Sequence, residues 1–141
     1  MADLKALVIV GTTRQGRVGK KVADWYLEQA KAAQSGFDFE VLDIAEENLE
    51  LFNEPVSPMM RQYTKRQEEL AVKVAGADAF IFVTAEYNHS VPASLKNFID
   101  YLNPEWHHKV AGYVGYGSLG GVRSIEHLIQ IMAELRVASI K

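Results

Sequence analysis

Cysteine is absent from the 141-residue sequence. Its absence excludes disulfide bonds, thiolate nucleophiles and metal sites built on cysteine. The four histidines occur in neither an H-x-x-x-H nor an H-E-x-x-H spacing, so the sequence predicts no zinc site. The sequence also lacks any run of about 18 apolar residues, the length that a membrane-spanning helix needs. We therefore expect no metal cofactor and no membrane partner.

The sequence has little excess of charge of either sign. Lysine and arginine number 15 and aspartate and glutamate 18, which gives a net charge of −3. This balance predicts no binding to nucleic acid, so any anion must be bound by a local site. Apolar residues make up 48% of the chain and charged residues 23%, which fits one globular domain over residues 1–141. The first residues do not resemble a signal peptide, so we expect a cytoplasmic protein.

Short apolar runs alternate with helical patterns along the chain. Strands are predicted at continuous apolar runs, and helices where apolar residues recur at spacings of three and four. Pro55 and Pro58 break any long element, so mostly loop is expected over residues 45–63. The predicted strands are residues 6–10, 37–44, 79–84, 110–116 and 137–140, and the predicted helices are 18–35, 64–75, 92–102 and 124–135.

This alternation predicts an α/β domain with a parallel sheet and helices on both of its faces. The sequence ends at Lys141, inside or just after the fifth predicted strand. Doubly wound domains usually add a helix after that strand, so the C-terminal helix is expected to be missing here. A shortened chain, a further tail or a partner that covers the exposed edge would each account for its absence.

Ligands of open α/β sheets bind beyond the carboxyl ends of the strands. The loops that follow three of the predicted strands, residues 11–17, 84–91 and 116–121, are expected at that edge. The first of these loops has the chemistry of an anion site, because it combines glycines, hydroxyl donors and the N-terminus of a helix. No acidic residue occurs between Gly11 and Lys21. The hydroxyl-bearing and basic residues of this segment are Thr12, Thr13, Arg14, Arg17, Lys20 and Lys21, of which the two lysines are expected at the surface.

Other phosphate-binding motifs fit this loop poorly. A P-loop requires lysine and a hydroxyl residue after its second glycine, but Arg17 and Val18 follow Gly16. A dinucleotide fingerprint requires glycine at position 13, which is Thr13. A hydroxyl-rich loop for the terminal phosphate of a mononucleotide such as FMN remains. The alternative is an ordinary polar loop followed by a solvated basic helix face.

The other two loops suit a flat ring. Tyr87 can pack on an aromatic face, and backbone groups near Glu86 and Asn88 can bond to a pyrimidine edge. The glycine-rich turn at residues 117–121 allows close approach of a planar ligand. Taken alone, Tyr87 also suits a surface or interface position, Glu86 a solvated charge, and the glycine turn a simple connection between strand and helix.

Together these residues resemble the NAD(P)H-dependent FMN reductase family, a flavodoxin-like group that includes quinone, azo-dye and chromate reductases. The resemblance covers nearly the whole chain, and its longest motif extends from Val83 to Pro92. That resemblance implies a five-stranded parallel sheet in the order 2-1-3-4-5. The matching motifs are Gly11-Thr12-Thr13-Arg14 with Gly16-Arg17, then residues 83–92, Leu95-Lys96-Asn97 and Asp100-Tyr101-Leu102, and finally Tyr116-Gly117 with Gly120-Gly121.

The resemblance also implies roles for individual residues. The FMN phosphate would contact Thr12, Arg14, Arg17 and Val18; the isoalloxazine ring would be held by Ala85, Glu86, Tyr87 and Asn88 and lined on its other side by Tyr116, Gly117, Ser118 and Gly121. Two positions depart from the family pattern. Ala85 replaces a usual proline, and Glu126-His127 stands where a glutamine-leucine-arginine pattern is common.

The activity implied is transfer of hydride from NADPH or NADH to FMN, followed by reduction of a quinone, a flavin, an azo compound or a metal oxyanion. Because FMN would carry the chemistry, no catalytic side chain is predicted. The resemblance also implies a homodimer or homotetramer. Two alternatives stay open: a flavodoxin-like electron carrier and a binding domain without turnover. A receiver domain is rejected because Gly11-Thr12 and Thr84-Ala85 occupy the positions of its carboxylates.

Overall fold

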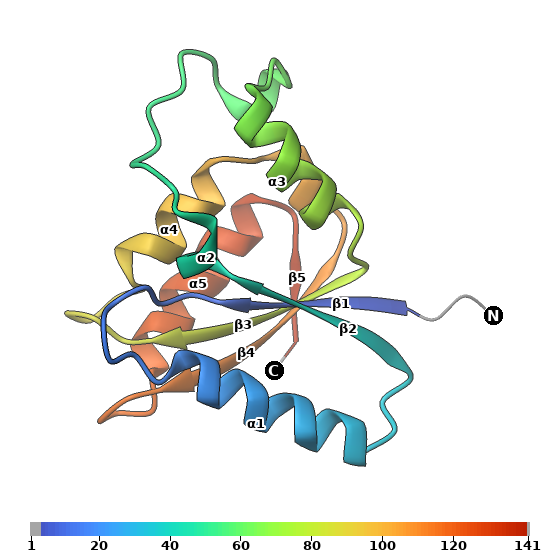
Figure 1. Cartoon of the computed structure of the whole chain (residues 1–141), viewed down its shortest axis with the longest axis vertical. Coiled ribbons are helices and arrows are strands. Elements are labelled where there is room, and N and C mark those ends of the chain that lie inside the picture. Colours follow the sequence, from blue (N-terminus) through green and yellow to red (C-terminus); the bar gives the residue numbers. More distant parts are fainter. Residues whose placement is uncertain (1–3, 141) are drawn as a thin grey trace.

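In the computed structural model, which describes residues 4–140, five parallel strands form one sheet in the order β2-β1-β3-β4-β5 (Figure 1). This order, which the family resemblance implied, is confirmed. The strands are β1 (Leu4–Val10), β2 (Phe37–Asp43), β3 (Ala79–Ala85), β4 (Val110–Tyr116) and β5 (Ala138–Ser139). Neighbouring side chains of β1, such as those of Leu7 and Val8, point to opposite faces of the sheet. Both are buried, because helices pack against both faces.

All four predicted helices are present, with ends that differ by a few residues. They are α1 (Gly19–Ala32), α3 (Lys65–Ala75), α4 (Ala93–Asp100) and α5 (Val122–Glu134). Helix α3 begins with a capping box: the Thr64 side chain accepts from the Gln67 backbone, and the Gln67 side chain accepts from that of Thr64. None of the helices within residues 4–140 is long and apolar enough to cross a membrane.

The segment predicted as mostly loop contains two further short elements. Helix α2 (Ile44–Glu47) follows β2 directly, and the 3₁₀ helix η1 (Pro58–Met60) lies further along the chain. Helix α2 begins because the Asp43 side chain accepts a hydrogen bond from the Ala45 N–H, and it ends at Asn48 in a left-handed conformation. A single turn shows no helical periodicity, so the sequence pattern did not reveal it.

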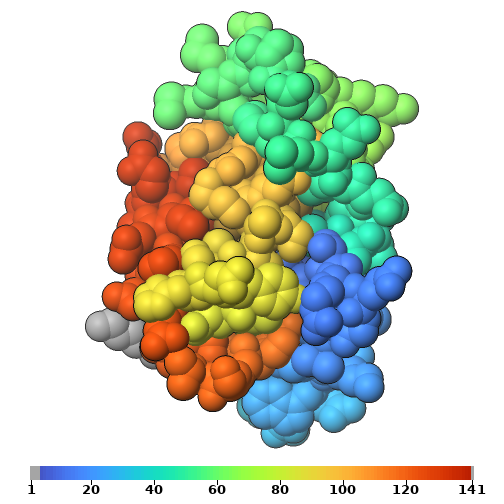
Figure 2. All heavy atoms as spheres, turned by 90° about the vertical axis from the view of Figure 1, so that its left-hand side faces the viewer, coloured from blue at the N-terminus to red at the C-terminus, as the bar shows by residue number. Residues whose placement is uncertain are grey.

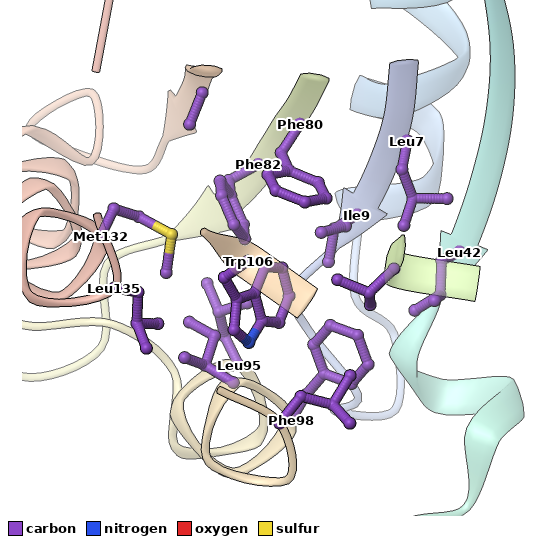
Figure 3. Packing of buried hydrophobic residues seen from close by; sticks show 14 of the residues in the cluster. Leu7, Ile9, Leu42, Phe80, Phe82, Leu95, Phe98, Trp106, Met132 and Leu135 are labelled. Carbon is purple, nitrogen blue, oxygen red and sulfur yellow. The ribbon is translucent and has the colours of Figure 1, made fainter. Parts of the chain in front are cut away.

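The larger core lies between the sheet and helices α3, α4 and α5 (Figure 3). Trp106, from the 3₁₀ helix η2 (Pro104–Trp106), is fully buried at its centre. The indole contacts the rings of Phe80, Phe82 and Phe98, with centroids 5.0, 6.2 and 5.7 Å away. These edge-to-face and tilted packings tie α4 and η2 to β3 and thereby fix the direction of the loop that follows β3.

The opposite face of the sheet is covered by α1, the only helix on that side within the described residues. Its smaller core consists of Val8, Val10, Ala23 and Val83. Strand β5 is shorter than the predicted strand over residues 137–140. It begins at Ala138, because the Val137 N–H bonds back to the Met132 carbonyl in α5. Together, the two cores hold β1, β3 and β4 side by side, and their carboxyl ends reach the same edge of the sheet.

Candidate functional site

Three loops meet where β1, β3 and β4 end: loop 1 (residues 11–18), loop 2 (residues 85–91) and loop 3 (residues 116–121). Figure 2 faces the edge at which these strands end in Figure 1 and shows blue loop 1, yellow loop 2 and orange loop 3 on one surface. All twelve residues predicted to bind the cofactor therefore lie at the carboxyl edge, as the topology predicted.

Loop 1 is fixed at its start by Gly11. Its N–H donates to the carbonyl of Val83 at 2.9 Å, and its own carbonyl accepts from Ser94 Oγ at 2.9 Å. A Cβ atom at this position would lie 3.0 Å from a methyl carbon of Leu95 and 3.2 Å from the Val83 carbonyl oxygen, so a larger residue would require its neighbours to move. Loop 1 is thus joined to β3 and to the first turn of α4.

The middle of loop 1 presents unused donors. Within the described residues, the backbone N–H groups of Thr13, Arg14, Gln15 and Gly16 donate to no carbonyl and no side chain, and all four residues are exposed. Helix α1 follows with no side-chain cap and no acidic residue in its first turn. The free N–H groups and the positive end of the helix dipole give this loop the chemistry that suits an anion.

The two arginines of loop 1 differ in their partners. Arg17 donates to both carboxylate oxygens of buried Asp43, at 2.8 and 2.7 Å, and this hydrogen bonding raises the pKa of the Arg17 guanidinium. Arg14 is exposed and forms no ion pair with any residue between 4 and 140. Because Asp43 already balances the charge of Arg17, Arg14 is the cation of this loop most available to a ligand.

Loops 1 and 3 meet at the hydroxyl groups of Thr12 and Tyr116, which lie 3.2 Å apart and form a hydrogen bond. The Thr12 side chain is fully buried, so its hydroxyl faces Tyr116 and not the surface. Burial raises the pKa of the Tyr116 phenol, while the hydrogen bond with Thr12 and the nearby arginines act in the opposite direction. The first residue of α1, Gly19, packs directly against this pair.

Loop 2 contains a tight turn over Tyr87–Ser90. Tyr87 N–H donates to the Ser90 carbonyl at 3.0 Å, and Ser90 N–H donates to the Tyr87 carbonyl at 3.2 Å. The two central residues, Asn88 and His89, have φ angles of +49° and +73°, a conformation that L side chains rarely adopt. The turn projects Asn88 and His89 to the surface and leaves Tyr87 half-buried.

Two contacts attach the start of loop 2 to α5. The carboxylate of Glu86 accepts from the Arg123 guanidinium and from the Arg123 backbone N–H, each at 3.2 Å. It thereby caps the N-terminus of α5 from a neighbouring loop. Beneath it, the buried hydroxyl groups of Thr84 and Ser124 are hydrogen-bonded at 3.1 Å. Glu86 is therefore not a solvated charge, and its backbone is held in a fixed position.

Loop 3 is built for close approach. Gly117 and Gly120 have positive φ angles and open space where a Cβ atom would stand. Gly121 also has a positive φ angle, and a Cβ atom there would lie 2.8 Å from the Tyr116 backbone nitrogen. The backbone of loop 3 therefore faces solvent without bulk at Gly117 and Gly120, while Ser118 is exposed beside them.

The chemistry of these loops fits FMN. Loop 1 supplies amide donors and a free arginine for a phosphate, and loops 2 and 3 supply a half-buried tyrosine and bare glycine backbone for a ring. Beside loop 1, a largely polar cavity of about 290 Å³ is lined by Thr13, Asn48, Ser94 and Asn97, among others. A larger cavity of about 460 Å³ lies instead between α4, α5 and residues 52–58, near the C-terminal ends of both helices.

Several residues of this site were not identified from the sequence. They are Asp43, Ser94, Arg123 and His127, each of which holds a loop residue from another element. Only Asp43 gave a local signal, because an acidic residue at a strand end can cap the turn that follows. The pairing of Asp43 with Arg17 spans 26 residues, and no local pattern reveals such a pair.

Comparisons with known sequences identify the family of this chain. The NADPH-dependent FMN reductase family matches residues 4–141. An NAD(P)H-dependent FMN reductase of Schizosaccharomyces pombe is 40% identical over 120 residues, which make up 83% of this chain and 60% of that protein. Another from a Nectria species is 34% identical over 146 residues, covering 97% of this chain and 73% of the relative. This chain therefore spans about three fifths to three quarters of these relatives.

Solved structures share the fold. FerB, a flavoenzyme NAD(P)H:(acceptor) oxidoreductase from Paracoccus denitrificans, superposes with a TM-score of 0.78 at 23% identity, over 98% of this chain and 75% of FerB. The NAD(P)H:quinone oxidoreductase from Methanothermobacter marburgensis gives a TM-score of 0.71 at 15% identity, over 99% of this chain and 83% of that protein. The sequence matches go further than the fold, and by them the chain belongs to the NADPH-dependent FMN reductase family.

Proposed function

We propose that this chain is an NAD(P)H-dependent oxidoreductase that binds FMN at the carboxyl edge of its sheet. Bound FMN would accept hydride from NADPH or NADH and pass the electrons to a small acceptor: a quinone, a flavin, an azo compound or a metal oxyanion. The observation that carries this proposal is the anion site of loop 1, with its free amides and exposed Arg14, beside the bare backbone of loop 3.

The protein residues then have distinct roles. Loop 1 would hold the phosphate through backbone amides, the start of α1 and the side chain of Arg14, while Arg17 and Thr12 keep the loop in shape through Asp43 and Tyr116. The proposed phosphate contacts are the side chain of Arg14 and backbone groups of Thr12, Arg17 and Val18. The proposed ring contacts are Ala85, Glu86, Tyr87 and Asn88 on one side and Tyr116, Gly117, Ser118 and Gly121 on the other.

The first experiment is a visible absorption spectrum of the protein with FMN, before and after NADPH or NADH is added without oxygen. Protein-bound flavin bands that bleach rapidly would support the reductase. Bound flavin that stays oxidised with both nucleotides would favour the flavodoxin-like carrier, and no binding would overturn the proposal. The net charge of −3 favours the enzyme, because carriers of that kind are often far more acidic.

The phosphate assignment predicts that Arg14→Ala weakens FMN binding by about 10-fold, the loss expected for one charge-assisted hydrogen bond. Riboflavin, which lacks the phosphate, should bind equally weakly to both proteins. Fluorescence titration measures both affinities. Lys21→Ala is the matched control, because Lys21 is exposed and forms no ion pair within residues 4–140. Equal FMN affinity of Arg14→Ala and the unaltered protein would contradict the assignment.

Three finer points remain part of the proposal. Relatives named as a quinone oxidoreductase and an azoreductase support a small-molecule acceptor. A homodimer or homotetramer and a cytoplasmic location are predictions that rest on the family resemblance and on the sequence. Sedimentation of the protein with and without FMN measures the oligomeric state.

A further inference from the structure

Helix α5 contacts loop 2 at two places on one of its faces. Arg123 and His127 stand one helical turn apart, so their side chains project in the same direction. Arg123 binds Glu86 at the start of the loop, and His127 Nδ1 lies 2.9 Å from Ser90 Oγ at the end of the turn. The two contacts enclose the segment between Glu86 and Ser90.

That segment needs support from outside. Asn88 and His89 both adopt positive φ angles without being glycine, and residues in this conformation persist only where the surrounding structure holds them in place. The two backbone hydrogen bonds between Tyr87 and Ser90 close the turn but do not attach it to the rest of the protein. At the Ser90 end, Val91 packs against the larger core, and the side chain of Ser90 itself is hydrogen-bonded to His127.

The contact between Ser90 and His127 can hold the turn against α5. Both residues are half-buried, and the rings of His89 and His127 lie 5.9 Å apart, so the imidazole also supports the strained position. A serine hydroxyl donates and accepts, so the bond forms with either tautomer of His127. His127 also occupies one of the positions where this chain departs from the family pattern.

We propose that His127 is a positioning residue, which holds loop 2 in its FMN-binding shape through Ser90. The identity of the ligand, FMN, rests on the proposed function, whereas the anchoring of the turn by His127 does not. Without the anchor, the turn samples other conformations, and FMN must order it again on binding. FMN affinity therefore falls by about 5- to 10-fold, the equivalent of one hydrogen bond.

The test compares His127→Ala, Ser90→Ala and His127→Asn with the unaltered protein. Asparagine keeps a polar atom where the imidazole Nδ1 lies, so it retains the bond to Ser90. Gln130→Ala, an exposed position on the same helix, is the matched control. Two quantities are measured: FMN affinity by fluorescence titration, and exchange of the Tyr87 and Ser90 amide protons in the FMN-free protein by NMR.

The proposal expects both alanine variants to lose FMN affinity and amide protection together, while His127→Asn and Gln130→Ala keep both. Unchanged affinity and protection in His127→Ala would overturn it. Equal losses in His127→Asn and His127→Ala would also overturn it, because packing and not the hydrogen bond would then be responsible. If the unaltered protein binds no FMN, the proposed function fails, and amide exchange alone decides whether His127 anchors the turn.

Discussion

At the scale of single residues, the ion pair between Arg17 and Asp43 joins loop 1 to the end of β2. The Asp43 side chain is only 3% exposed and that of Arg17 19%, so the pair is largely shielded from water. Asp43 also caps α2 through the Ala45 N–H. One buried carboxylate therefore fixes two segments, and its loss leaves a partly buried guanidinium without a counter-charge.

We predict that Asp43→Asn lowers the free energy of unfolding by about 2–3 kcal/mol. Breaking a fully buried pair costs about 3–5 kcal/mol, and the partial exposure of Arg17 reduces this. Urea unfolding measures the change. Asp24→Asn is the control, because Asp24 pairs with Lys20 at the surface and should change stability by less than about 0.5 kcal/mol. Similar losses in the two variants would contradict the prediction.

The placement of the site residues was predictable from the sequence only where it depends on local chemistry. The glycines and the basic residues of loop 1 indicated an anion site, and the structure places their exposed amides together. The burial of the Thr12 hydroxyl and the neutralisation of Arg17 were not predictable. Both depend on partners, Tyr116 and Asp43, which only the folded chain brings near.

At the scale of elements, the first residue of α1 decides how loops 1 and 3 meet. A Cβ atom at Gly19 would lie 2.5 Å from Thr12 Oγ1 and 2.8 Å from the Tyr116 hydroxyl. Gly19 has an ordinary helical conformation, so alanine is not excluded by its backbone. The requirement for glycine comes from the contact alone.

We predict that Gly19→Ala weakens FMN binding by at least about 10-fold, because the methyl group pushes loop 1 away from loop 3. Alanine favours helix by about 1 kcal/mol, so part of the steric cost to stability is offset, and affinity is the sharper measurement. Gly76→Ala, at the end of α3 and far from the site, should bind FMN as the unaltered protein does. If Gly19→Ala binds FMN as tightly as the unaltered protein, the contact between loops 1 and 3 at Gly19 does not shape the FMN site.

Elements with a long and regular pattern were predicted well, and short ones were not. The runs that form β1 and β3 are continuous and apolar, and α5 has a clear apolar face. Helix α2 was missed because its one turn depends on a cap from Asp43 and not on periodicity. The contact of α5 with loop 2 was also missed, because it joins segments that are distant in the sequence.

At the scale of the whole molecule, the two faces of the sheet bury several tyrosines to different depths. Burial is the largest cause that raises the pKa of Tyr26, Tyr63, Tyr101, Tyr113 and Tyr116. These residues come from both sides of the sheet and from segments throughout the chain. Their common response to pH is therefore a property of the fold and not of one site.

We predict that the protein loses stability above about pH 10. A phenol whose pKa is raised by folding stays protonated in the folded state while the unfolded state ionises, so stability is complete below the unfolded pKa of about 10 and falls as pH rises toward the folded value. One such tyrosine lowers the free energy of unfolding by at most about 1.4 kcal/mol per pH unit, and by less where solvent reaches it.

Urea unfolding between pH 8 and 11.5 measures this loss, and absorbance of the tyrosinate near 295 nm follows ionisation in the same samples. The largest upward shift is that of Tyr63, where burial and the hydrogen bond to Glu105 act together. Tyr63→Phe should therefore flatten the alkaline slope, because it removes one ionising group from the unfolded state. A constant free energy of unfolding across this range, with phenols that titrate near pH 10 in the folded protein, would show that these tyrosines are not buried as the two cores require.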